Sequence, residues 1–181
     1  MKYEDLMIDT ETMGMPPDGA LLSIGAVFFD LQTCKLGPTF NQTINLATAV
    51  RDGGTLNPST IMWWLGQSQE ARDAVRFSAF DIRSVLTDFS AFIAEHSSHK
   101  SVRPWGNSST FDLSIIGSAH QRSAIAQPWI FWNERCFRTV RSMYPQVEYD
   151  PESKGTRAHN ALADAVFQAE HLFKIKNRNK K

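Results

Sequence analysis

The pattern that most constrains the fold is a set of three strand-like segments near the amino terminus, followed by helical segments. Residues 6–8, 20–30 and 40–46 are apolar, or alternate between apolar and polar side chains, as β-strands do. The links between them contain glycine, proline and aspartate, and links this short favour antiparallel neighbours. This order of strands and helices predicts an α/β fold, with helices flanking a mixed sheet.

Residues that cap helices mark where the later elements begin. Asn57 stands before a proline, and Ser68 and Asp81 precede further helical segments, so each is expected to be an N-cap. The stripe of apolar residues after Asp81 is typical of one longer amphipathic helix. Beyond it we expect a strand at 101–105 and helices at 111–119, 134–143 and 160–176.

The composition is that of a folded protein without a membrane segment. Of the 181 residues, 42% are hydrophobic and 21% are charged, which excludes a chain that is mainly disordered. No apolar run approaches the roughly 20 residues of a membrane span, and no signal peptide is evident. Cys34 and Cys136 are too few for a disulfide framework, so we expect a reducing, cytoplasmic setting.

The charge is balanced, with 19 basic and 19 acidic residues. A net charge of zero argues against a protein that coats nucleic acid without specificity, although an enzyme that grips one strand end remains compatible with it. We interpret residues 1–175 as one domain and residues 176–181 as a basic tail.

Two acidic residues close the first strand-like run. Asp9 and Glu11 are two positions apart, so in a strand their side chains point to the same side. The carboxyl end of a strand is where open α/β folds bind ligands, and paired carboxylates suit Mg²⁺ or Mn²⁺. Alone, the pair is weak evidence, because Glu148 with Asp150 and Asp150 with Glu152 have the same spacing.

Three further residues extend this candidate site, and each also has a plain structural interpretation. Asp112 is expected in the first turn of a helix, where the helix dipole stabilises an acid. Asp164 lies among alanines in the last helix, so it is expected to be partly buried and to need a partner. His159 precedes that helix, where a histidine is commonly a cap or a surface residue.

Three short motifs, taken together, resemble those of the DnaQ-like (DEDDh) 3′–5′ exonuclease superfamily. In chain order they are residues 8–14, 107–112 and 159–164. The third motif begins with a histidine, as in the DEDDh subgroup. The segment 54–65 also resembles the phage and prophage exonuclease VIII-like branch related to mycobacterial-type exoribonucleases. The five positions that match the catalytic residues of the superfamily are Asp9, Glu11, Asp112, His159 and Asp164.

The resemblance implies a ribonuclease-H-like fold and a phosphodiester hydrolase that uses two divalent cations, Mg²⁺ or Mn²⁺. It implies that Asp9 bridges both cations, that Glu11 and Asp164 complete the first site, and that Asp112 serves the second through water. His159 would be the general base. Candidate substrate contacts are Thr12, Met13, Trp64, Asn107 and Phe111, although the aromatic residues among them could equally belong to the core.

The expected function is a 3′–5′ exonuclease that releases nucleoside 5′-monophosphates from a single-stranded end, with DNA favoured over RNA. An exoribonuclease of the same fold is the main alternative. An inactive protein that binds nucleic-acid ends is a third interpretation, which the five matching residues argue against. A homodimer is also compatible with the apolar segments 61–65 and 129–132.

Overall fold

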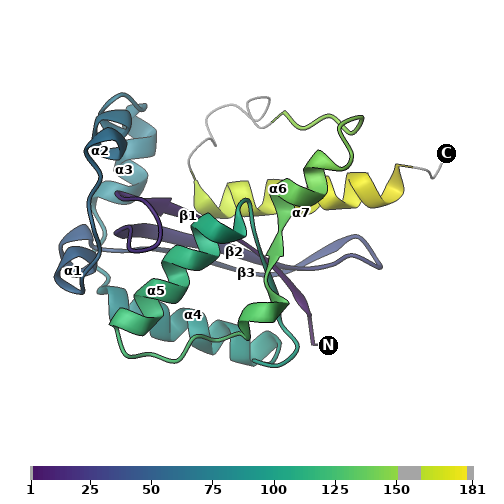
Figure 1. The fold of residues 1–181 in the computed structure, drawn as a ribbon, viewed down its shortest axis with the longest axis horizontal. Helices are drawn as coiled ribbons and strands as arrows, with labels where there is room; N and C mark the ends of the chain where they lie inside the picture. The colour runs from purple at the N-terminus through teal and green to yellow at the C-terminus, as the bar shows by residue number, and fades with distance from the viewer. Residues whose placement is uncertain (1, 151–159, 179–181) are drawn as a thin grey trace.

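The computed structural model describes residues 2–150 and 160–178, and within them five strands form one mixed sheet. The spatial order is β3-β2-β1-β4-β5 (Figure 1). Strand β2 is antiparallel to both β1 and β3, whereas β4 is parallel to β1 and β5 is parallel to β4. The strands are β1 (Asp5–Thr12), β2 (Leu21–Asp30), β3 (Lys35–Thr43), β4 (Arg103–Gly106) and β5 (Arg135–Cys136). The predicted α/β fold with a mixed sheet is therefore confirmed.

The predicted helix starts at residues 57, 68 and 81 are also confirmed. The side chain of Asn57 accepts from the backbone N–H of Thr60, and Ser68 and Asp81 cap their helices in the same way. Asn160 caps the last helix by accepting from Ala163. The helices begun by these caps are α2 (Pro58–Leu65), α3 (Gln69–Arg76), α4 (Ile82–His96) and α7 (Ala161–Asn177).

Three expected elements differ in the structure. The strand expected at 40–46 runs over 35–43 instead, because Asn45 caps a short helix, α1 (Leu46–Arg51), and so ends the extended segment. The helix expected at 134–143 begins late, because Arg135 and Cys136 pair with β4 before α6 (Phe137–Ser142) starts. The helix expected at 111–119 is a π-helical turn, η1 (Ser109–Leu113), continued by α5 (Ser114–Arg122). A single 3₁₀ turn, η2 (Phe131–Asn133), precedes β5.

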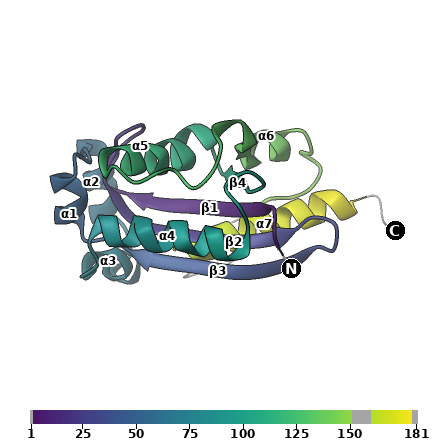
Figure 2. The ribbon, with the colours of Figure 1, turned by 90° about the horizontal axis from the view of Figure 1, so that it is seen from below.

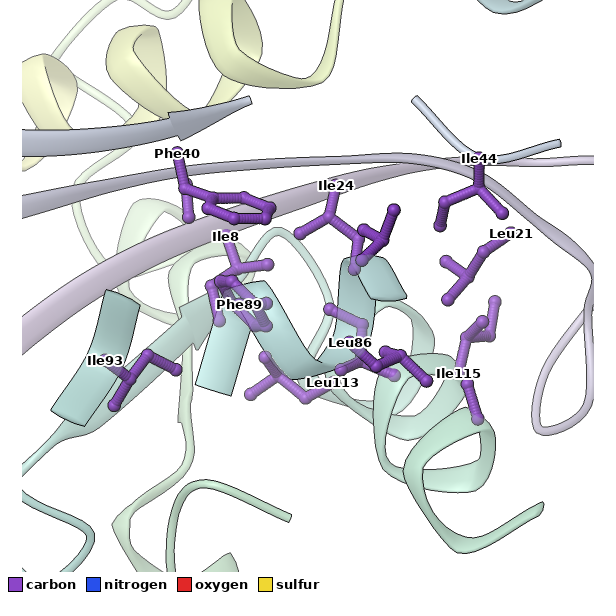
Figure 3. Packing of buried hydrophobic residues seen from close by; sticks show 14 of the residues in the cluster. Ile8, Leu21, Ile24, Phe40, Ile44, Leu86, Phe89, Ile93, Leu113 and Ile115 are labelled. Atoms are coloured by element: carbon purple, nitrogen blue, oxygen red, sulfur yellow. The ribbon is translucent and has the colours of Figure 1, made fainter. Parts of the chain in front are cut away.

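The strands alternate between two apolar layers. Helices α4 and α5 cover one face of the sheet, and α7 covers the other, with α6 beside it (Figures 1 and 2). Leu6 and Ile8 of β1 belong to the apolar layer on the α4 side. Figure 3 shows Ile8 in this layer with Ile24, Leu86 and Phe89. Met7, between Leu6 and Ile8 in sequence, packs into the α7 layer. Burial on both faces explains why β1 and β2 contain few exposed positions.

The arrangement leaves one end of the sheet for a site. Strand β1 points its carboxyl end toward α2 and α3, and α7 starts near that end on the opposite side from α4 (Figure 1). Helix α7 ends at Asn177, one residue beyond the end of the helix expected at 160–176. Among the described helices, not one combines the length and the apolar character needed to cross a membrane.

Candidate active site

Three carboxylates meet where β1 ends and α7 begins. One ligand oxygen from each of Asp9, Glu11 and Asp164 lies within 4.8 Å of the others. Asp9 and Glu11 come from β1, where two-residue spacing places them on the α7 side of the sheet. Asp164 comes from the first turn of α7. The structure therefore brings together two residues that the sequence predicted as a pair and a third that lies more than 150 positions away.

The close approach of α7 depends on a glycine in the neighbouring strand. Gly25 of β2 pairs directly with Asp9. A Cβ atom placed on Gly25 would come within 2.1 Å of the backbone of Ala161 and Leu162. Hydrogen at this position thus lets the first turn of α7 lie against β2, and that contact places Asp164 beside the acids of β1.

Asp112 approaches the site from the π-helical turn η1. The ladder between β1 and β4 ends at Ile8 and Gly106, so the backbone N–H of Thr10 has no strand partner on that side. Asp112 takes its place, because Oδ1 accepts from the Thr10 N–H (3.2 Å) and from Thr10 Oγ1 (2.8 Å). These bonds hold the fourth acid at the end of β1.

Burial and mutual repulsion shape the electrostatics of the site. Burial raises the pKa of Asp9 well above its usual value, and the charges of Asp112, Glu11 and Asp164 raise it further. Burial, together with Asp164 and Asp112, raises the pKa of Glu11 to about 8. Burial also raises the pKa of Asp112, although its hydrogen bonds to Thr10 oppose the shift. Without a cation, the site therefore favours protonated carboxyl groups.

The residues of this site fit a divalent cation. Within residues 2–150 and 160–178, no lysine, arginine or histidine forms a salt bridge with Asp9, Glu11 or Asp112. Buried carboxylates need a compensating charge, and clustered carboxylate oxygens are the ligands that Mg²⁺ and Mn²⁺ prefer. In the segment between β4 and η1, Oδ1 of Asn107 is buried with no hydrogen-bond partner in the described structure, which leaves this acceptor available.

Sequence reasoning missed three residues that shape this site. They are Thr10, which holds Asp112, Gly25, which admits α7, and Gln168, whose Nε2 donates to Asp9 Oδ1 at 2.8 Å. The position of Gln168 one turn after Asp164 was the available signal, because residues four apart share a helix face. Thr10 and Gly25 carried no comparable signal in the sequence.

The loop after β1 holds the candidate contacts Thr12 and Met13. The carbonyl of Thr12 accepts from Trp64 Nε1 at 2.9 Å. The N–H of Met13 donates to Ala20, and its carbonyl accepts from Asn57. These backbone groups are thus engaged within the protein. Met13 also lines an apolar cavity of about 470 Å³ between α1, α2 and α3, whose lining contains none of the four acids.

The aromatic candidates differ in exposure. Trp64 lies on the buried side of α2, is only 4% exposed and packs with Leu22 and Ala71. The adjacent Trp63 is 44% exposed. Phe111 is half-buried and contacts the apolar layer on the α4 side. Exposure therefore favours Trp63 over Trp64 as a ring that a nucleobase can stack on. His159, the expected general base, lies outside the described residues.

Comparison with known proteins was consistent with this geometry. Residues 4–176 match the family model described as the 3′–5′ exoribonuclease Rv2179c-like domain. The chain is also 26% identical, over 196 aligned positions, to a protein of Enterobacteria phage T4 named exodeoxyribonuclease. That alignment covers 90% of this chain and 84% of the phage protein.

Solved structures share the fold. Exonuclease I of E. coli, in a zinc-bound complex with single-stranded DNA, superposes with a TM-score of 0.68 at 17% identity. The match covers all of this chain but only 42% of exonuclease I. The nuclease domain of 3′hExo, a DEDDh family member bound to rAMP, gives a TM-score of 0.60 at 16% identity, covering 98% of this chain and 94% of that domain. At these identities the likeness establishes the ribonuclease-H-like fold.

Proposed function

This chain belongs to the family of Rv2179c-like 3′–5′ exoribonuclease domains and is a 3′–5′ exonuclease, and we propose on that premise that it degrades single-stranded DNA with two divalent cations. The products are nucleoside 5′-monophosphates, released one at a time. The single observation that carries this proposal is the cluster of Asp9, Glu11 and Asp164 at the end of β1, with Asp112 held beside it by Thr10.

The four acids are suited to hold Mg²⁺ or Mn²⁺. When bound, such cations stabilise the negative charge that develops on the phosphate and on the leaving oxygen. We propose that Asp9, Glu11 and Asp164 bind one cation and that Asp9 and Asp112 serve the second. Glu11 and Asp112 are buried, which limits the screening of their interaction with a cation by bulk water.

We propose His159 as the general base. It directly precedes Asn160, the N-cap of the helix that carries Asp164, and it is the histidine of the third motif in the sequence. His159 would take the proton from the attacking water as its oxygen bonds to phosphorus and the bond to the 3′ oxygen breaks. Replacing it by alanine should lower kcat by about 10²–10⁴. A loss below threefold, with the variant folded, would contradict this role.

DNA is proposed as the substrate because the phage T4 relative is named an exodeoxyribonuclease. The second candidate is RNA, and the description of the family model favours it. For contacts beyond the acids, we propose stacking on the exposed face of Trp63 and hydrogen bonding by Asn107, with Thr12, Met13 and Phe111 bordering the terminal nucleotide. Trp64 contributes by supporting Trp63 and the Thr12 carbonyl.

The test is a time course on DNA and RNA oligonucleotides of one sequence, labelled at the 5′ end, with Mg²⁺, Mn²⁺ or EDTA. We expect a ladder that shortens from the 3′ end, faster on DNA, and that vanishes in EDTA and with the Asp9→Asn variant. Faster cleavage of RNA would replace the DNA assignment by the exoribonuclease candidate. Tight binding of both oligonucleotides without cleavage would indicate an end-binding protein instead.

We also propose that each chain folds as a single domain, that two chains form a homodimer, and that the protein acts in the cytoplasm. Support for an interface comes from exposed apolar side chains on two surfaces, Met62 and Leu65 on α2, and Phe131 and Trp132 on η2. Light scattering at micromolar concentration tests the dimer, and a monomer there would contradict it.

A further inference from the structure

Gln168 is a buried amide that contacts the metal-binding cluster without being one of its acids. It lies on α7 one turn after Asp164, on the face that packs against the sheet, and it is only 1% exposed. Its Nε2 donates to Asp9 Oδ1 at 2.8 Å across 159 positions of sequence. Small neighbours, Ala165 and Ala169, let this helix face come close to β1.

The orientation of this amide is determined by its partner. Gln168 Nε2 faces Asp9 Oδ1, and this is the orientation that an ionised, cation-binding Asp9 requires, because such a carboxylate only accepts hydrogen bonds. The oxygen, Oε1, is buried and has no hydrogen-bond partner in residues 2–150 and 160–178. A buried acceptor without a partner lowers stability. A glutamine at this position is therefore a poor choice for packing alone.

The charge of the partner also matters. An arginine or lysine at this position would neutralise Asp9 and compete with a cation. The amide is neutral, so it fixes the orientation of the carboxylate without adding a positive charge that would compete with a cation. The bond from Gln168 engages Oδ1 and leaves Oδ2 without this bond. Groups that hold ligands in this way are common behind metal sites.

We propose that Gln168 is a positioning residue that holds the Asp9 carboxylate in the orientation needed to bind cations. This inference rests on the proposed function, because it assigns Gln168 a role toward the same metal site. A positioning role predicts that some properties change and that others do not. Loss of the amide should weaken cation binding and slow the chemical step, while the affinity for DNA and the stability of the cation-free fold are maintained.

The experiment compares Gln168→Leu and Gln168→Met with Gln121→Leu, which removes an exposed amide on α5. Binding of Mn²⁺ alone is measured by isothermal titration calorimetry, melting temperature is measured in EDTA, and kcat and KM are measured on single-stranded DNA. We expect both Gln168 variants to bind Mn²⁺ 10–100-fold more weakly and to lose kcat by about the same factor. KM should change less than threefold, and Tm in EDTA should not fall.

The outcomes are distinguishable. Mn²⁺ affinity within twofold of the wild type in both folded Gln168 variants would overturn the positioning role. A fall in Tm with unchanged Mn²⁺ affinity would assign Gln168 to packing and would overturn it equally. A wild-type protein that neither binds Mn²⁺ nor cleaves an oligonucleotide would overturn the proposed function, and this inference with it.

Discussion

One aspartate lies toward each end of β1, the buried Asp5 and the half-buried Asp9, and their surroundings differ in charge. At the amino end, Asp5 is 4% exposed and accepts two hydrogen bonds from Arg103, at 2.9 and 2.7 Å, and one from Trp105 Nε1. At the carboxyl end, Asp9 accepts from a neutral amide and faces three other acids. The fold neutralises the first charge itself and leaves the second for a cation.

This difference separates stability from function along a single strand. The pair of Asp5 and Arg103 ties β1 to β4, since the two residues are also opposite each other in the parallel ladder. The cluster at the other end opposes folding when no cation is present, because burial and repulsion both disfavour ionised carboxylates. Four variants or conditions, given in order of decreasing effect, test this contrast.

The largest effect should come from Asp9→Asn. We expect kcat to fall by at least about 10³, because several kcal/mol of transition-state stabilisation are lost at about 1.4 kcal/mol for each factor of ten. In EDTA the same variant should melt at a higher temperature than the wild type, since one of four crowded charges is gone. Single-turnover cleavage and thermal melts measure both, with Glu95→Gln on the exposed side of α4 as the control. Retained activity of the Asp9→Asn variant would contradict the assignment of the metal site.

Arg103→Met tests the opposite end of the strand. Removing the guanidinium leaves the buried Asp5 without its positively charged partner. We therefore expect the free energy of unfolding to fall by about 3 kcal/mol. Activity per folded molecule should remain close to that of the wild type, because the acids at the other end are untouched. Urea denaturation measures the free energy of unfolding, and active-site titration measures the activity per folded molecule. If cleavage fell with no change in stability, the contrast between the two ends would be wrong.

Gly25→Ala tests how the helix reaches the site. The new methyl group would lie 2.1 Å from the backbone of Ala161 and Leu162, so the start of α7 must move away from β2. Displacing Asp164 by about 1 Å should reduce kcat by about 10²-fold. Gly66→Ala is the matched control, because its nearest neighbour there is 3.4 Å away and the backbone is helical. Equal activity of the two variants would show that the position of α7 is not set by Gly25.

The smallest effect, taken per pH unit, is that of pH on stability. The folded protein holds a proton on Glu11 up to a pKa of about 8, whereas the unfolded chain releases it near 4.5. Between these values the folded state binds more protons, so stability in EDTA should decrease as pH rises, by up to about 1.4 kcal/mol per pH unit. Saturating Mg²⁺ should flatten the slope. Denaturation series from pH 5 to 8 measure it, and stability that increased with pH in EDTA would contradict the buried, un-neutralised cluster.

Local signals explain what sequence reasoning predicted correctly. Asn57, Ser68 and Asp81 cap helices because a short side-chain acceptor and a following helical segment are enough to define an N-terminus. The late start of α6 has a tertiary cause. Arg135 and Cys136 look helical in isolation, yet β4 offers them hydrogen-bond partners that lie some 30 residues away. Strand pairing of this kind depends on tertiary neighbours, which periodicity does not reveal.

By itself, the sequence determined the order of strands and helices, the common side of Asp9 and Glu11, and the motifs that mark Asp112, His159 and Asp164. Those features depend on residues close together in the chain. Only the tertiary structure decided that α7 lies on Gly25, that Thr10 holds Asp112, and that Gln168 orients Asp9 while Arg103 neutralises Asp5. Each of these contacts joins distant segments, and it exists because packing brings two elements within hydrogen-bond or van der Waals distance.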